Sequence, residues 1–143
     1  MHNFDPLGNL RNEIFEEFAI NNFSLLRDNL FFRNIKYNNI EILKLISFLV
    51  RDKNWNNYNP EIIKTTSYNK DNKLHFDFDL KYGDTEKFEV KFSLSIGNNS
   101  VKLTAKGKFL SDFWTNRIGF NLLLPLDGVV NQQVNVSKSD QTT

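Results

Sequence analysis

Apolar and polar residues alternate with a period of two along most of the chain, most regularly in residues 73–82. The apolar positions of this run are Leu74, Phe76, Phe78 and Leu80, and the polar positions between and after them are His75, Asp77, Asp79 and Lys81. Successive side chains of a β-strand point to opposite faces of the sheet. The run therefore predicts a strand with one face on a core and the other in water, as antiparallel sheets permit.

Similar strand-like runs fill the rest of the chain. They lie at residues 18–26, 30–37, 40–50, 61–68, 86–96, 100–110, 117–124 and about 133–136. Asn, Asp and Gly residues separate most of them and are typical of tight turns, while a Pro and an Asp-Gly pair at 125–128 predict a corner. Roughly nine strands about ten residues apart predict an all-β fold, an antiparallel β-sandwich with a small β-barrel as the alternative.

The beginning of the chain has a different period. The apolar residues Leu7, Leu10, Ile14, Phe15 and Phe18 fall roughly on one helical face, with glutamates on the other. Segment 1–20 therefore predicts a short N-terminal helix, followed by a single β-domain over residues 21–143. A chain of 143 residues is the size of one domain.

Composition excludes several classes of function. Eighteen Lys and Arg against 17 Asp and Glu give a net charge of +1, which argues against a nucleic-acid partner because such proteins carry a basic excess or a basic face. The chain has no Cys and two His, so a metal or other cofactor is not expected. No secretory signal or membrane-length apolar run is apparent, and we expect a cytoplasmic protein without a membrane partner.

Two carboxylates on one strand face are the first candidate site. Asp77 and Asp79 would lie about 7 Å apart, close to the spacing of carboxyl pairs in glycosidases. Lys81 and His75 continue the same polar face, and a solvated outer face is the more ordinary interpretation. A metal role for His75 is not expected, because the face offers no second His or Cys to complete a ligand set.

The loop at 51–60 is the second candidate. Arg51, Asp52, Trp55 and Tyr58 combine planar hydrogen-bonding groups with aromatic rings, as sugar-binding loops do. Arg117 is a further candidate because guanidinium groups suit carboxylates and phosphates. The structural alternatives are an internal Arg-Asp pair, aromatic rings that anchor a long loop, and a Gly119 that marks a bulge beside Arg117.

No known catalytic motif occurs in the chain, so its being an enzyme is left open. Two stretches, RDNLFFRNIKYNNIEILKLISFLVRDKNW and NRIGFNLLLPLDGVVNQQVNVSKSD, resemble the N-terminal β-domain of the D-apionate lactonase family over about residues 27–140. The residues that match the family pattern are Val50, Arg51, Asp52, Trp55, Asn116, Arg117, Gly119, Phe120, Leu123 and Pro125.

The resemblance implies a bacterial protein of carbohydrate catabolism in which this β-domain precedes a TIM-barrel domain. Catalytic residues would then lie mainly in the barrel, at the C-terminal ends of its strands. Leu124 stands where the family pattern has a His before Pro, and Lys138 and Gln141 replace a second His and a Gly, which puts a polar junction with the barrel in doubt. The implied role is noncatalytic docking on a barrel of the same or a separate chain, with an exposed apolar patch.

A small carbohydrate- or ligand-binding β-module is the alternative function. It predicts a concave, aromatic-lined cleft near Trp55, Tyr58, Arg51 and Trp114. An autonomous hydrolase that uses Asp77 and Asp79 is a third hypothesis, which the absence of any further catalytic group disfavours.

Overall fold

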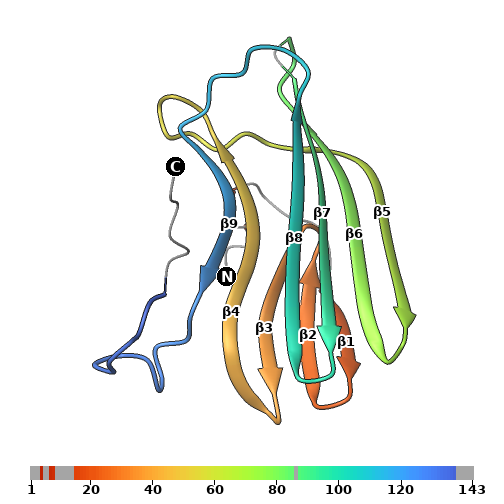
Figure 1. Ribbon diagram of the computed structural model, residues 1–143, viewed down its shortest axis with the longest axis vertical. Helices are drawn as coiled ribbons and strands as arrows, with labels where there is room; N and C mark the ends of the chain where they lie inside the picture. The colour runs from red at the N-terminus through yellow and green to blue at the C-terminus, as the bar shows by residue number, and fades with distance from the viewer. Residues whose placement is uncertain (1–3, 5–6, 9–14, 86, 138–143) are drawn as a thin grey trace.

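The computed structural model describes residues 4, 7–8, 15–85 and 87–137, which form two antiparallel β-sheets packed face to face (Figure 1). One sheet has five strands in the order β1-β2-β3-β4-β9, and the other has four in the order β5-β6-β7-β8. The strands are β1 (Glu16–Ile20), β2 (Phe23–Asp28), β3 (Phe31–Tyr37), β4 (Ile40–Arg51), β5 (Glu61–Lys70), β6 (Lys73–Tyr82), β7 (Phe88–Gly97), β8 (Ser100–Phe109) and β9 (Arg117–Leu123). The two sheets do not close into a barrel, so the predicted all-β sandwich is confirmed.

Five hairpins have two-residue turns, and three of these turns have both residues at positive φ. Asn38-Asn39 joins β3 to β4, Asp71-Asn72 joins β5 to β6, and Asn98-Asn99 joins β7 to β8. All six turn residues have φ between 50° and 62°, the left-handed conformation that a type I′ turn requires at both positions. Asn and Asp tolerate this conformation better than other side-chain-bearing residues, which explains why the sequence places them between the strands.

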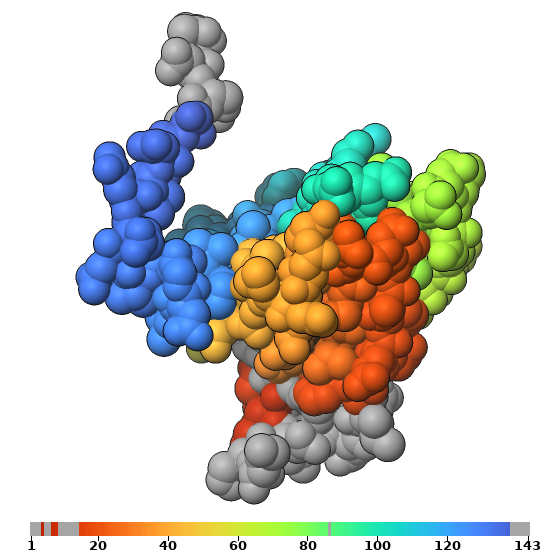
Figure 2. All heavy atoms as spheres, turned by 90° about the horizontal axis from the view of Figure 1, so that it is seen from below, coloured from red at the N-terminus to blue at the C-terminus, as the bar shows by residue number. Residues whose placement is uncertain are grey.

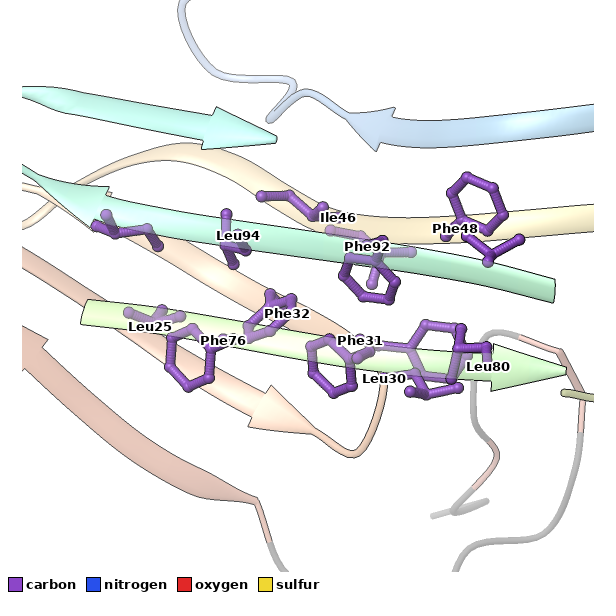
Figure 3. Close-up of a cluster of buried hydrophobic side chains, with 14 of the residues drawn as sticks. Leu25, Leu30, Phe31, Phe32, Ile46, Phe48, Phe76, Leu80, Phe92 and Leu94 are labelled. Carbon is purple, nitrogen blue, oxygen red and sulfur yellow. The ribbon is translucent and has the colours of Figure 1, made fainter. Parts of the chain in front are cut away.

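Phenylalanine rings from both sheets form the core (Figure 3). Phe32 of β3 packs against Phe76 of β6 with 4.9 Å between ring centroids. Phe78 of β6 stacks on Phe92 of β7 at 4.5 Å, and Phe48 of β4 lies 6.1 Å from Phe92 across the sandwich. Burying one such side chain stabilises a fold by about 1.5–3 kcal/mol, so this aromatic layer is a main reason why the two sheets stay together.

The predicted N-terminal helix is wrong where the structure describes the segment. Glu16–Ile20 is strand β1, an edge strand that pairs with β2; Leu10 and Ile14 lie outside the described residues. Phe18 meets Phe76 edge to face at 4.9 Å, and Ile20 is 9% exposed. Both residues therefore face the core at the period of a strand, and a turn at Asn21 divides the predicted run 18–26 into two strands.

The predicted last strand at 133–136 is also wrong. β9 and the corner at Pro125 form as expected, but the chain then makes a helical turn in which the Val130 N–H donates to the Leu126 carbonyl at 3.1 Å. Gly128 at φ 77° belongs to the same turn. Residues 132–137 follow without secondary structure, because the turn directs the chain away from the sheet, and the arm projects from the body (Figure 2).

Candidate functional site

Two loops meet at the end of the sandwich where β4 finishes and β9 begins (Figure 1). The Arg51 carbonyl accepts hydrogen bonds from the Thr115 hydroxyl at 2.8 Å and from the Asn116 N–H at 2.9 Å. The Tyr58 hydroxyl donates to the Trp114 carbonyl at 3.2 Å. These bonds hold the loop at 51–58 against the loop at 110–117 and bring Arg51, Asp52, Trp55, Tyr58 and Arg117 to one end of the molecule.

Asp52 organises the first of these loops. Its Oδ1 accepts the backbone N–H groups of Asn54 and Asn56 at 2.8 and 2.9 Å, and its Oδ2 accepts the Asn56 side-chain amide at 3.2 Å. Partial desolvation acts to raise the pKa of this carboxyl, but the donors from Asn56 and Asn54, together with Lys53, outweigh it and hold the pKa below its usual value. The carboxylate thus shapes the turn and has most of its acceptor capacity occupied.

Trp55 is held in an unusual backbone conformation by this turn. Its φ is 67°, in the left-handed region, and its N–H donates to the Asp52 carbonyl at 3.1 Å. Bulky residues rarely adopt this conformation because the side chain crowds the backbone. The indole is nevertheless 55% exposed, so core packing does not explain why a tryptophan stands here.

Tyr58 and Trp114 have different surroundings. The Tyr58 ring packs on Phe113 with 4.9 Å between centroids and contributes to the apolar packing around the core. Trp114 is 69% exposed. Tyr58 is therefore an anchor that joins the two loops, whereas the two tryptophans present apolar surface to solvent.

Arg51 and Arg117 face each other across the β4–β9 ladder. Their opposed positions put two positive charges on the same side of the sheet. The predicted internal pairing of Arg51 with Asp52 is not observed among the contacts of the described residues, because the Asp52 carboxylate binds its own loop instead.

The carboxylates of β6 have structural partners. Asp79 lies 4.0 Å from the Lys91 ammonium on the neighbouring strand. Asp77 accepts a hydrogen bond from Tyr68; desolvation and then this carboxylate raise the pKa of the Tyr68 hydroxyl. Tyr68 also stacks on His75 with 4.8 Å between centroids and an 8° angle between ring planes. Within the described ranges, no group of three or more His, Asp and Glu residues is arranged to hold a metal ion.

Among the concavities of the described surface, four have volumes of about 540, 450, 160 and 450 Å³. The most apolar of them is lined by Phe23, Tyr37, Ile42, Leu43 and Val101, with Asn99 and Ser100 at its edge. None of the four is lined by Arg51, Asp52, Trp55, Tyr58 or Arg117. The aromatic residues of the loop cluster therefore do not line any of these hollows.

A set of exposed apolar residues lies in and after the edge strand β9, together with Ile40 at the start of β4. We call it the C-terminal apolar surface; its members are Ile40, Leu122, Leu123, Leu124, Leu126, Val130, Val134 and Val136, each between 46% and 75% exposed. Ile40 and Leu126 line the same concavity of about 450 Å³. The sequence signal of this surface is the apolar run at 122–124, which exceeds the alternation of a half-buried strand. In the part of the chain that the structure describes, no helix is long and apolar enough to cross a membrane.

Comparisons with known proteins identify the family of this chain. The profile of the family described as "D-apionate lactonase, N-terminal domain" matches residues 11–143. A curated D-apionate lactonase from Brucella anthropi is 28% identical over 113 residues, which cover 77% of this chain and 19% of the relative. The chain thus spans about a fifth of the length of this curated relative, and no solved structure matches it. The chain belongs to the D-apionate lactonase N-terminal domain family.

Proposed function

We propose that this chain is a noncatalytic β-sandwich domain that docks on the catalytic part of a D-apionate lactonase-like protein, a TIM-barrel domain of the same or a separate chain. The observation that supports docking is the C-terminal apolar surface. Exposed apolar residues that gather in one part of a domain mark an interaction site. The surface includes the arm that follows β9.

The noncatalytic role is supported by the state of the candidate acids. Asp52 is bonded within its own loop, Asp79 lies beside Lys91, and Asp77 accepts from Tyr68. A general acid or base needs to reach a substrate proton, and each of these carboxylates has a neighbour that explains its position. The lactone chemistry of the relative is therefore assigned to the four-fifths of its length that this chain does not match.

A ligand-binding module is the second candidate. Such a module would place its aromatic residues in a concave site. Trp55 and Trp114 are mostly exposed, and the four concavities described above are lined by other residues. Docking is therefore the better supported role.

The test is binding in trans. The Brucella anthropi D-apionate lactonase would be expressed without the region that matches this chain, and binding would be measured by isothermal titration calorimetry. The relative's own matched region serves as the positive control. The proposal expects this chain to bind, and the Leu124→Asp and Leu126→Asp variants to bind at least tenfold more weakly. The matched control is Ile63→Asp, at a 57% exposed apolar residue of β5, which should leave binding unchanged.

A further inference from the structure

The arginine pair at the loop end of the sandwich has the features of an anion site. Arg51 and Arg117 are direct cross-strand partners, which places their Cβ atoms about 5 Å apart. Like charges at such positions repel each other and weaken the sheet. Placing two guanidinium groups here is therefore unfavourable unless a negative charge lies between them.

No carboxylate of the described residues supplies that charge. Asp28 pairs with Arg33 and Asp79 with Lys91, on other strands of the sandwich. The acid nearest in sequence, Asp52, accepts three hydrogen bonds from Asn54 and Asn56. Among the described residues, the charge on the arginine pair is thus left uncompensated by an acid.

Two unsatisfied polar atoms extend the site in one direction. On the side of Arg51 away from Arg117, a β-bridge places Asn57 opposite Arg51. The Arg51 Nε and the Asn57 Oδ1 are both buried, and neither has a hydrogen-bond partner. Buried donors and acceptors are normally paired. Asn57, Arg51 and Arg117 therefore form a row, here called the guanidinium row, that carries excess positive charge. Its Arg51 Nε is a donor without a partner that a carboxylate can use, whereas the Asn57 Oδ1 is an acceptor and adds no bond to a carboxylate.

The row lies where a partner can reach it. Arg117 is exposed, and the exposed indoles of Trp55 and Trp114 stand in the two loops that flank the row. Arg and Trp are the residues most enriched among those that dominate the energy of protein interfaces. The planar guanidinium group binds carboxylates through two parallel hydrogen bonds.

We infer that the guanidinium row is a carboxylate-binding site. The carboxylate comes either from a free small acid or from an Asp or Glu side chain of a partner protein, and it bridges Arg51 and Arg117. The site is separate from the C-terminal apolar surface, and the inference does not depend on the proposed docking function.

The test follows the Nε–Hε signals of Arg51 and Arg117 by nuclear magnetic resonance during titration of the full chain. One arm uses sodium malonate, and the other uses a capped Gly-Glu-Glu-Gly peptide; sodium chloride at equal ionic strength is the reference. Saturable shifts of both signals with either carboxylate support the site. Tighter binding of malonate identifies a small acid as the source, and tighter binding of the peptide identifies a protein side chain. Shifts no larger than those in chloride overturn the inference.

Variants separate a specific site from general attraction of anions. Arg51→Gln and Arg117→Gln should each weaken carboxylate binding at least tenfold. Lys102→Gln, which removes an exposed positive charge from β8, should leave it within a factor of two. Equal affinity in Arg117→Gln and the unmodified chain would overturn the inference.

A second readout needs no added ligand. Arg117→Glu introduces a carboxylate directly opposite Arg51, so it should supply the missing charge within the chain. The midpoint of thermal unfolding should then rise in the order unmodified chain, Arg117→Gln, Arg117→Glu, and malonate should no longer shift the Arg51 signal. A midpoint for Arg117→Glu below that of Arg117→Gln would contradict repulsion within the row.

Discussion

Replacing Trp55 separates the cost of its backbone conformation from the value of its ring. We compare Trp55→Asn with Trp55→Ala. Both variants lose the same indole, which is 55% exposed in the folded chain. They differ in how well the new residue tolerates φ 67°.

The magnitude follows from the conformational preference. A residue with an ordinary side chain pays roughly 1–2 kcal/mol in the left-handed region, whereas Asn is several-fold enriched there, which corresponds to about 1 kcal/mol. Trp55→Asn should therefore be about 1 kcal/mol more stable than Trp55→Ala. For a chain of 143 residues, an unfolding entropy of about 2.1 cal/mol/K per residue converts this into a difference of about 3 °C in midpoint.

The assay is thermal unfolding of both variants by differential scanning calorimetry at identical concentration and pH. Trp114 provides the matched control because it is also mostly exposed and its φ is not positive. Trp114→Asn should gain no such advantage over Trp114→Ala. The reasoning is refuted if Trp55→Ala is as stable as Trp55→Asn, or if the Trp114 pair shows the same difference.

Three further changes test the packing and the loop. Gly107→Ala should lower the free energy of unfolding in urea by about 1–3 kcal/mol, because a Cβ at Gly107 would lie 2.5 Å from the Phe88 ring. An unchanged unfolding midpoint would show that the ring moves freely. Phe92→Ala should lower the free energy of unfolding by about 3–5 kcal/mol, because the Phe92 ring is 2% exposed and its centroid lies 4.5 Å from that of Phe78. A loss below about 1 kcal/mol would contradict the aromatic core. The pKa of Asp52 is lower in the folded chain than its unfolded value of 3.8. The stability that this carboxylate adds is therefore complete above pH 3.8 and is lost as the pH falls through the folded pKa. Asp52→Asn should therefore be less stable than the unmodified chain at pH 7, and the two should converge at low pH; a gap independent of pH would argue against the lowered pKa.

Alternation made the central strands predictable. In β6, Phe76, Phe78 and Leu80 are at most 2% exposed while the polar residues between them are not buried, as the sequence indicates. Such agreement is expected where one sheet face meets a core and the other meets water, because the side-chain period then coincides with the burial period.

The two chain ends could not be predicted in the same way. Phe18 fits a helical stripe and a strand face equally well when the run is only five residues long, and its packing on Phe76 decides between them. Val134 and Val136 have the alternation of a strand, but a strand needs a neighbour to pair with, and the turn at Leu126–Val130 carries them away from the sheet. Tertiary contacts that are distant in sequence decide both cases.

The loop cluster was only partly predictable. The sequence groups Arg51, Asp52, Trp55 and Tyr58 in one candidate loop. The structure brings Arg117 to the same end through the β4–β9 register. That register depends on pairing 66 residues apart in sequence, which composition cannot reveal. Asn57 gave no signal, because its importance lies in its position opposite Arg51.

The abundance of asparagine has a structural explanation. Eleven described residues other than glycine have positive φ, and ten of them are Asn or Asp. Asparagine thus serves the turns and bulges of this sandwich, where its tolerance of the left-handed region is useful. Trp55 is the exception among the eleven, which is why its replacement is informative.

Hydrogen–deuterium exchange tests the docking proposal most directly. Exchange would be measured for this chain alone and after addition of the Brucella anthropi D-apionate lactonase lacking the matched region, with that relative's own matched region as the positive control. The docking account predicts protection at residues 122–137 and around Ile40, and none at the Asp71-Asn72 turn of β5 and β6. Protection confined to other surfaces, or none while the control region is protected, would contradict the proposal that the C-terminal apolar surface is where this domain docks.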